Sequence, residues 1–337
     1  MNAREGDLIE TKDNIIFDVK GLVHPPDRVV AFIRYVPDPI GNRERDGRRY
    51  TKFYNLSKRY ALLKQKYPQY LIDDPVFNTL LCEVPIEDIK THYQPAQGLQ
   101  KLRNRKNLDT AETTALRFME ILKENSGVQW SKLGVSGSIL VHLQEPSSDI
   151  DLIVYGTETG YRVAETMQEL FEDETSPVEA YNRDGLRELF DFRSKDTNVS
   201  FEDFVRTDSR KVSHGKFMNK HFFIRFVKNL NEISEQYGSI IYKPEGNAKI
   251  KATIANDSEA LFTPCTYKLV NVQTIEGSKT EPIEEIVSFR GRFCEQAKSG
   301  ETVIAEGKVE RVQKEGKCDH FRLLLGNKPS DHMILTK

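Results

Sequence analysis

The chain has 337 residues, more than one ordinary hydrophobic core holds, which predicts two or three domains. Its 49 Lys and Arg residues nearly balance its 51 Asp and Glu residues, so the net charge does not indicate a nucleic-acid-binding protein. The first residues are polar, and no apolar run reaches the roughly 18 to 20 residues of a membrane span, so we expect neither a signal peptide nor a membrane segment. The four cysteines form no CxxC pair, which is typical of reduced thiols in the cytoplasm.

The order of strand and helix patterns predicts an α+β protein with three regions. The N-terminal region, residues 1–100, is predicted to be α/β. Residues 14–23 and 27–36 are rich in Val, Ile and Phe and are bounded by Pro, Gly and Asp, which predicts two strands.

A stretch at residues 43–67 mixes basic and aromatic side chains. Phosphates attract Arg and Lys, and exposed tyrosines can stack on unpaired bases, so this stretch is a candidate RNA-binding surface. The alternative is a helix from Leu56 to about Pro68 whose aromatic side chains face the core and whose charges face water. The candidate nucleic-acid-binding residues are Arg45, Arg48, Arg49, Lys52 and Arg59.

The middle region, residues 101–240, alternates helix and strand patterns. Asp109 and Glu112 fit a capping box at the start of a helix. The patterns then predict strands at 130–135, 149–155 and 220–227, a short helix within 136–143 and a longer helix at 160–173.

The C-terminal region, residues 241–337, changes to short strand candidates separated by turns rich in Gly, Asn and Lys. This composition predicts a small β-barrel or a β-sandwich. Cys318, His320 and His332 lie there without the spacing of a zinc site.

Asp149 and Asp151 stand in an otherwise apolar run. Alternate side chains of a strand point the same way, so the two carboxylates share one face. Adjacent carboxylates repel unless a cation lies between them, and Mg²⁺ prefers one or two carboxylates together with phosphates and waters. The pair is therefore a candidate metal site for phosphoryl chemistry.

Gly137 and Ser138 lie upstream of this pair, at the start of the predicted short helix. A glycine lets the backbone approach a ligand closely, and the free amides of a helix start can hold phosphate oxygens. The Ser138 hydroxyl can add a further hydrogen bond. The two features together predict a phosphate-binding turn beside a metal site.

The order Gly137-Ser138, ten intervening residues, then Asp149-Ile150-Asp151 resembles the signature of the DNA polymerase β-like nucleotidyltransferase superfamily. The flanking regions look like those of uncharacterised archaeal predicted nucleotidyltransferases. The resemblance implies transfer of a nucleoside monophosphate from an NTP to a hydroxyl group, with release of pyrophosphate. It implies that Asp149 and Asp151 hold Mg²⁺ or Mn²⁺ and that Gly137 and Ser138 hold the triphosphate.

The superfamily usually adds a third carboxylate from a later strand, but the matching strand, residues 220–227, contains none. Acidic residues elsewhere are candidates, although the solvated face of a helix is the more common role for each of them. They are Asp191, Glu202, Asp203, Asp208 and Glu235.

Two cations are candidate nucleotide ligands. Arg225 lies on the strand at 220–227 and could bind a phosphate bidentately, or form a salt bridge to one of the two aspartates. Lys216 belongs to the segment RKVSHGK, which is either a phosphate-contacting loop or an ordinary polar connector.

We therefore expect a cytoplasmic, Mg²⁺-dependent nucleotidyltransferase whose acceptor is open, with RNA or tRNA as one candidate. The first alternative is an RNA-binding protein that kept the fold and lost catalysis. The second is an NTP-sensing protein or a toxin–antitoxin partner. The acceptor, the preferred nucleotide and the oligomeric state do not follow from the sequence.

Overall fold

The computed structural model describes residues 1–194, 198–278 and 283–336. The chain forms two compact units, the first made of Met1–Asp73, Leu80–Glu179 and Val212–Ser234 and the second of Asp74–Thr79, Ala180–Lys211 and Glu235–Lys337. Most of the predicted N-terminal and middle regions thus share one unit, whereas Asp74–Thr79, Ala180–Lys211 and the residues from Glu235 onward group with the C-terminal region.

The N-terminal sheet of the first unit has the strand order β4-β5-β3-β2-β1-β8, and β7 pairs with β3 and β6. Its central antiparallel pair, β2 and β3, confirms the two strands predicted at 14–23 and 27–36. Phe17 and Val19 lie in the buried core beside this pair. The bounds are β1 Leu8–Thr11, β2 Ile16–Val19, β3 Arg28–Pro37, β4 Arg43–Arg45, β5 Arg48–Lys52, β6 Leu71–Asp74, β7 Thr79–Pro85 and β8 Ile89–Tyr93.

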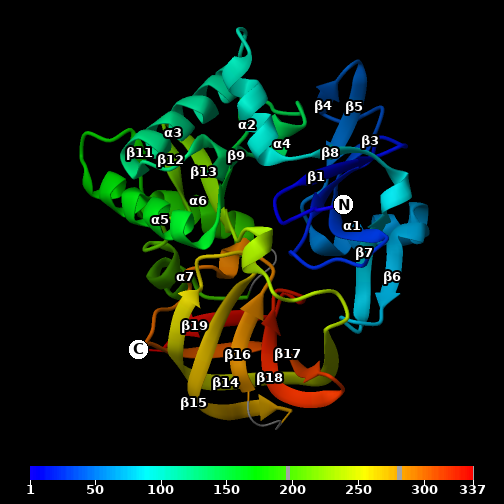
Figure 1. The fold of residues 1–337 in the computed structure, drawn as a ribbon. Coiled ribbons are helices and arrows are strands. Elements are labelled where there is room, and N and C mark those ends of the chain that lie inside the picture. Colours follow the sequence, from blue (N-terminus) through cyan, green and yellow to red (C-terminus); the bar gives the residue numbers. More distant parts are fainter. Residues whose placement is uncertain (195–197, 279–282, 337) are drawn as a thin grey trace. The chain divides into compact units, whose positions relative to one another are not determined.

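The second sheet of the first unit has the order β11-β12-β13-β10-β9. β10 (Ile150–Tyr155) runs parallel to β13 (Lys220–Val227), which confirms both predicted strands. Figure 1 shows α3 and α5 on one face of this sheet. Phe118 of α3 packs there against Phe217 and Phe222, with ring centroids 4.7 and 4.8 Å away. The other strands are β9 Leu133–Val135, β11 Val178–Glu179 and β12 His214–Phe217.

One helix of the first unit begins at a capping box that the sequence predicts. The predicted capping box is present before α3 (Thr110–Ser126): the Glu112 amide donates to Asp109 Oδ1 at 2.9 Å, and the Asp109 amide donates to Glu112 Oε2 at 3.0 Å. The other helices are α1 Leu56–Lys66, α2 Pro95–Asn104, α4 Gly137–Leu140 and α5 Thr157–Glu172. Within the described ranges, no helix has the length and apolar character required to cross a membrane.

The second unit is built on a barrel, one of the two architectures predicted for the C-terminal region. Its strand order is β14-β15-β16-β18-β17-β19, and an additional β14–β17 pairing closes the barrel. β16 and β18 are parallel, whereas the other pairs are antiparallel. The bounds are β14 Ile240–Glu259, β15 Cys265–Gly277, β16 Ile283–Ser288, β17 Thr302–Lys314, β18 Lys317–Leu325 and β19 His332–Leu335.

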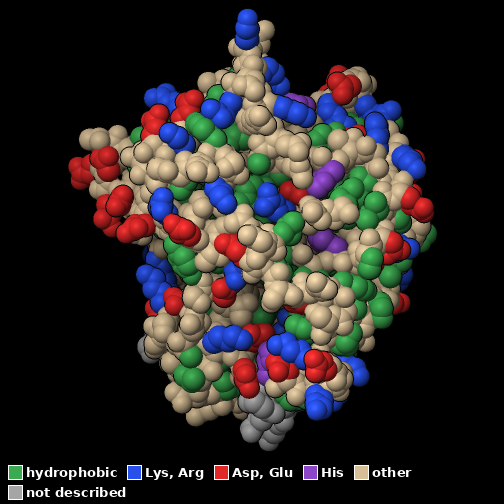
Figure 2. All heavy atoms as spheres, viewed as in Figure 1, with side chains coloured by type: hydrophobic (Ala, Val, Ile, Leu, Met, Phe, Trp, Pro, Cys, Tyr) green, Lys and Arg blue, Asp and Glu red, His purple; other side chains and the backbone are tan. Residues whose placement is uncertain are grey.

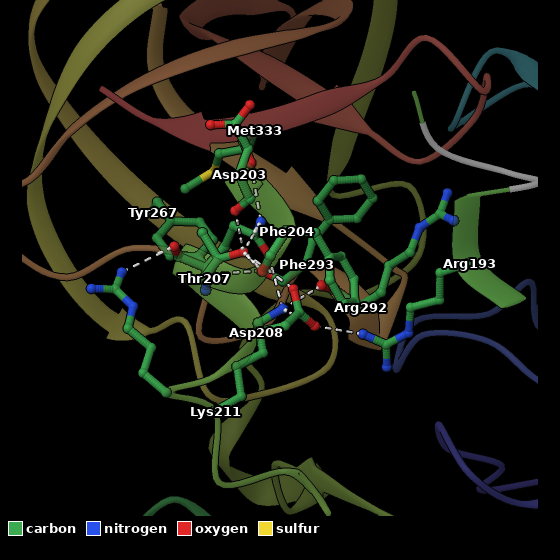
Figure 3. Close-up of polar contacts among 12 residues, drawn as sticks. Arg193, Asp203, Phe204, Thr207, Asp208, Lys211, Tyr267, Arg292, Phe293 and Met333 are labelled. Atoms are coloured by element: carbon green, nitrogen blue, oxygen red, sulfur yellow. Dashed lines mark hydrogen bonds and ion pairs between the residues drawn. The ribbon is translucent and has the colours of Figure 1, made fainter. Parts of the chain in front are cut away.

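A buried ionic cluster explains why the helices α6 (Arg183–Arg193) and α7 (Phe201–Asp208) belong to the second unit. Arg193 and Lys211 converge on the buried carboxylate of Asp208, at 2.7 and 3.3 Å (Figure 3). Lys211 also donates to the Arg292 carbonyl oxygen and to Gln296 Oε1, both at 2.8 Å. The cluster therefore fastens the end of α7 to the segment between β16 and β17.

Candidate active site in the first unit

The two aspartates of the motif lie at the start of β10. Asp149 precedes the strand and is exposed, whereas Asp151 is half-buried. In the register, Asp151 lies beside Phe223 of β13 and Ile153 lies beside Arg225. Paired residues of neighbouring strands share a face, so Asp151 and Arg225 lie on the same side of the sheet.

Gly137, the first residue of α4, lies directly against Asp151. Its φ of 59° is in the left-handed region, and a Cβ added to it would overlap Asp151 Oδ2 and lie 2.7 Å from Asp151 Cγ. The Ser136 amide donates to the Asp151 carbonyl oxygen at 2.8 Å, which fixes the turn against the strand. Only glycine fits at residue 137 without displacing the carboxylate.

Ser138, the second residue of α4, is buried, with 1% of its surface exposed. Among the described residues, its hydroxyl has no hydrogen-bond partner. Buried hydroxyl groups normally have a protein or water partner. The Ser138 hydroxyl is therefore a buried polar group next to Gly137 in the chain, although Ser138 is not among the residues that line the cavity described below.

A small cavity in the first unit brings predicted and unpredicted residues together. Gly137, Asp151 and Arg225 line it, together with Asp18 of β2 and Arg34 of β3. Neither Asp18 nor Arg34 was predicted, and the only signal for them was a charged residue inside an otherwise apolar strand. The remaining lining residues are Leu8, Ser136, Leu152, Ile153 and Phe223.

Arg225 is part of a buried ionic network. Its Nη1 lies 2.5 Å from Glu5 Oε1 and 3.6 Å from Asp18 Oδ1. Lys20 joins the same two carboxylates, at 3.0 Å each. Burial opposes the ionisation of Asp18, but Lys20 and Arg225 outweigh it and hold the pKa of that carboxyl well below its usual range. Arg225 thus forms ion pairs with Glu5 and Asp18, neither of which is one of the two aspartates considered as its partners.

The pKa of the Asp151 carboxyl group is shifted in the opposite direction to that of Asp18. Burial raises its pKa to about 6, and the negative charge of Asp149 contributes to this rise. Lys52, Arg34 and Arg225 oppose the shift without cancelling it. A carboxylate that is costly to ionise beside another carboxylate is one that a divalent cation would stabilise.

The basic stretch at 43–67 separates into buried and exposed side chains. Arg45 forms a 2.7 Å ion pair with Glu10, and the buried Arg59 donates to the Phe53 carbonyl oxygen at 3.0 Å. Arg48 and Arg49 are exposed on the β4–β5 hairpin, and Lys52 is half-buried. Basic and acidic side chains are interspersed on the face drawn in Figure 2. Arg45 and Arg59 therefore contribute to folding, which leaves Arg48, Arg49 and Lys52 accessible.

Lys216 lies on β12, which is separated from β10 by β13 in the sheet, and is paired with His221 of β13. It is not among the residues that line the cavity. Arg210, which precedes it, binds Glu301 through two contacts of 2.6 and 2.7 Å in the second unit. The segment RKVSHGK is thus divided between the two units, as expected of a connector.

The proposed acidic candidates for a third metal ligand, Asp191, Glu202, Asp203, Asp208 and Glu235, all belong to the second unit. Throughout the described residues, no group of three or more His, Cys, Asp or Glu side chains is arranged to hold a metal ion. Asp149 and Asp151 nevertheless fit Mg²⁺, which commonly uses two carboxylates and takes its other ligands from phosphates and water.

Comparison with known proteins identifies a relative along nearly the whole chain. The uncharacterized protein MJ1086 of Methanocaldococcus jannaschii is 32% identical over 334 residues, which cover 97% of this chain and 96% of that protein. No protein-family model matches the chain, and no solved structure matches it. Because the similarity spans both units, the chain belongs to the same protein family as MJ1086.

Proposed function

We propose that the protein is a Mg²⁺-dependent nucleotidyltransferase that transfers a nucleoside monophosphate from an NTP to a hydroxyl group. The observation that carries the proposal is the contact between Gly137 and Asp151. It puts the first residue of α4 against the half-buried carboxylate of Asp151 on β10, and the buried Ser138 hydroxyl belongs to the next residue of α4.

Asp149 and Asp151 would hold the metal ion, and the amides of Gly137 and Ser138 would donate to the triphosphate. Mg²⁺ supplies charge neutralisation and alignment of phosphate oxygens. In the reaction, the acceptor oxygen forms a bond to the α-phosphorus while the bond from that phosphorus to the bridging oxygen breaks. Pyrophosphate leaves, and the hydroxyl proton passes to water. Catalysis then depends mainly on positioning and on charge stabilisation.

RNA is the acceptor that we propose, with tRNA as one candidate. The observation in favour of RNA is the barrel of the second unit, closed by β14–β17 and with β16 parallel to β18. This strand order is that of the OB-fold, whose barrels commonly bind oligonucleotides. The binding-only alternative predicts no Mg²⁺-dependent NTP binding. The NTP-sensing alternative predicts such binding without nucleotidyl transfer.

Isothermal titration of the full chain with each NTP, with and without Mg²⁺, tests the proposed site. We expect Mg²⁺ to raise the affinity of the wild type and to have no effect on the Asp149→Asn/Asp151→Asn variant. Two results together would favour the binding-only alternative. The wild type would show no Mg²⁺-dependent NTP binding, and the variant would still bind RNA with a steep salt dependence.

A further inference from the structure

Two cations of the N-terminal sheet lie near the candidate site, and of the two only Arg34 is among the residues that line its cavity. Arg34, on β3, lines the same cavity as Gly137 and Asp151. Lys52, on β5, is paired with Tyr35, the residue that follows Arg34. Both cations act electrostatically on Asp151. The N-terminal sheet therefore brings positive charge to the site from outside the Gly-Ser and Asp-x-Asp motif.

Arg34 and Lys52 differ from the other cations near the cavity in their partners. Arg225 and Lys20 are each paired with Glu5 and Asp18. Within the described residues, neither Arg34 nor Lys52 forms an ion pair with a carboxylate. Their shared partner is the ring of Tyr54, whose centroid lies 5.3 Å from Arg34 Cζ and 4.6 Å from Lys52 Nζ.

Two like charges held at one aromatic ring repel each other, and the ring compensates each of them only modestly. The carboxylates of Asp18, Asp149 and Asp151 act on Arg34 electrostatically, but none of them forms a direct ion pair with it in the described structure. An anion of two or more charges that reaches both would remove this repulsion. A guanidinium presents a planar fork to phosphate oxygens, and an ammonium adds a compact charge. Tyr54 is 46% exposed, so it holds the pair at a surface that solvent reaches.

We propose that Arg34 and Lys52 bind the polyphosphate chain of the nucleotide substrate, with Tyr54 as the residue that positions both cations. This proposal rests on the proposed function, because it assigns the ligands of the NTP in the same cavity. A nucleotide is favoured over the backbone of RNA because Arg34 shares its cavity with Gly137 and Asp151. Arg225 is then a structural residue, since it already forms ion pairs with Glu5 and Asp18.

The test is isothermal titration of the full chain with sodium tripolyphosphate in EDTA, which removes any contribution of metal. We expect Lys52→Ala to weaken binding by about tenfold and Arg34→Ala/Lys52→Ala by more, because hydrogen bonds to charged groups are typically strong enough for such a factor. Lys58→Ala/Lys64→Ala, which removes two exposed charges of α1, is the matched control and should bind like the wild type. Arg34→Lys should retain part of the tripolyphosphate affinity that Arg34→Ala loses.

Thermal unfolding identifies any variant that fails to fold. Lys52→Ala should fold, because Lys52 contacts aromatic rings in the described structure and its removal leaves no carboxylate without a partner. Equal tripolyphosphate affinity in the wild type, Lys52→Ala and the Lys58/Lys64 control would overturn the proposal. So would a double variant that lost affinity for RNA while retaining affinity for tripolyphosphate.

The outcome is separable from that of the proposed function. Tripolyphosphate binding that depends on Arg34 and Lys52, without nucleotidyl transfer, would support this inference and contradict the enzyme. Nucleotidyl transfer with an unchanged KM for NTP in the Lys52→Ala variant would support the enzyme and contradict this inference.

Discussion

The backbone of Gly137 and the carboxylate of Asp151 are in direct contact, so that a methyl group on Gly137 could not be accommodated beside Asp151 Oδ2. Two constraints coincide at this glycine, a left-handed φ of 59° and the absence of space for a Cβ. The contact couples the position of the turn at Gly137 to that of the carboxylate, as the proposed nucleotidyl transfer would require.

Gly137→Ala should therefore lower the free energy of unfolding by about 2 to 5 kcal/mol and abolish the effect of Mg²⁺ on NTP binding. Left-handed backbone at a non-glycine residue costs about 1 to 2 kcal/mol, and overpacking adds about 1 to 3 kcal/mol. Gly127→Ala is the matched control, since Gly127 has a φ of 66° and no atom within 4 Å of the added Cβ. Denaturant unfolding and titration measure both effects, and equal losses in the two variants would show that the contact with Asp151 is unimportant.

Asp151 should titrate in the metal-free protein with a pKa of about 6. Because its folded-state pKa lies above the ordinary value of 3.8, the folded protein binds this proton more tightly than the unfolded chain. The stability of the wild type should therefore fall relative to Asp151→Asn as the pH rises from about 4 to about 6, and the difference should be constant above about pH 7.

Carboxyl carbon NMR shifts report this titration directly. Asp149→Asn should lower the Asp151 midpoint, because Asp149 contributes to the raised pKa. An unchanged midpoint in Asp149→Asn would mean that the two carboxylates do not interact, which would contradict a shared cation site.

Arg225→Met should destabilise the protein by about 2 kcal/mol, because the buried Glu5 carboxylate loses its 2.5 Å partner while it keeps Lys20 at 3.0 Å. Arg162→Met, which removes an exposed ion pair with Glu158, should cost less than about 1 kcal/mol. Glu5→Gln/Arg225→Met should recover part of the loss in denaturant unfolding. A stable Arg225→Met protein with weakened NTP binding would instead make Arg225 a phosphate ligand.

Asp208→Asn should destabilise the second unit by about 3 kcal/mol, because Arg193 and the buried Lys211 both lose a carboxylate partner. Its affinity for Mg²⁺ and NTP should equal that of the wild type. Glu202→Gln, which breaks an exposed ion pair with Arg183, provides the control and should leave stability nearly unchanged. Loss of Mg²⁺-dependent NTP binding in a folded Asp208→Asn protein would favour Asp208 as the third metal ligand.

Local patterns predicted most of the elements around the site. The capping box at Asp109 and Glu112 and the alternation in the strands at 149–155 and 220–227 each reflect interactions between residues close in the chain. Gly137 and Asp151 could be associated through a motif whose two halves are separated by a short loop. These features are therefore readable from the sequence alone.

Asp18, Arg34 and Glu5 could not be assigned to the site in the same way. They lie more than a hundred residues from Asp151 along the chain. Asp18 and Arg34 reach the cavity, and Glu5 reaches Arg225, only because of how the N-terminal sheet packs against β10 and β13. The ion pair of Arg45 with Glu10, 35 residues away, could not be predicted from local patterns either. Arg59 instead donates to the carbonyl oxygen of Phe53, a residue close to it in the chain.

Nucleotidyl transfer itself is the measurement that tests the central claim most directly. Full-length protein is incubated with each α-³²P-labelled NTP, Mg²⁺ or Mn²⁺, and total cellular RNA, and the RNA and protein are then separated. We predict label in RNA for the wild type and none for Asp149→Asn/Asp151→Asn. Label on RNA in both proteins, or on neither under any condition, would contradict the assignment of Asp149 and Asp151 as the metal ligands of an RNA nucleotidyltransferase.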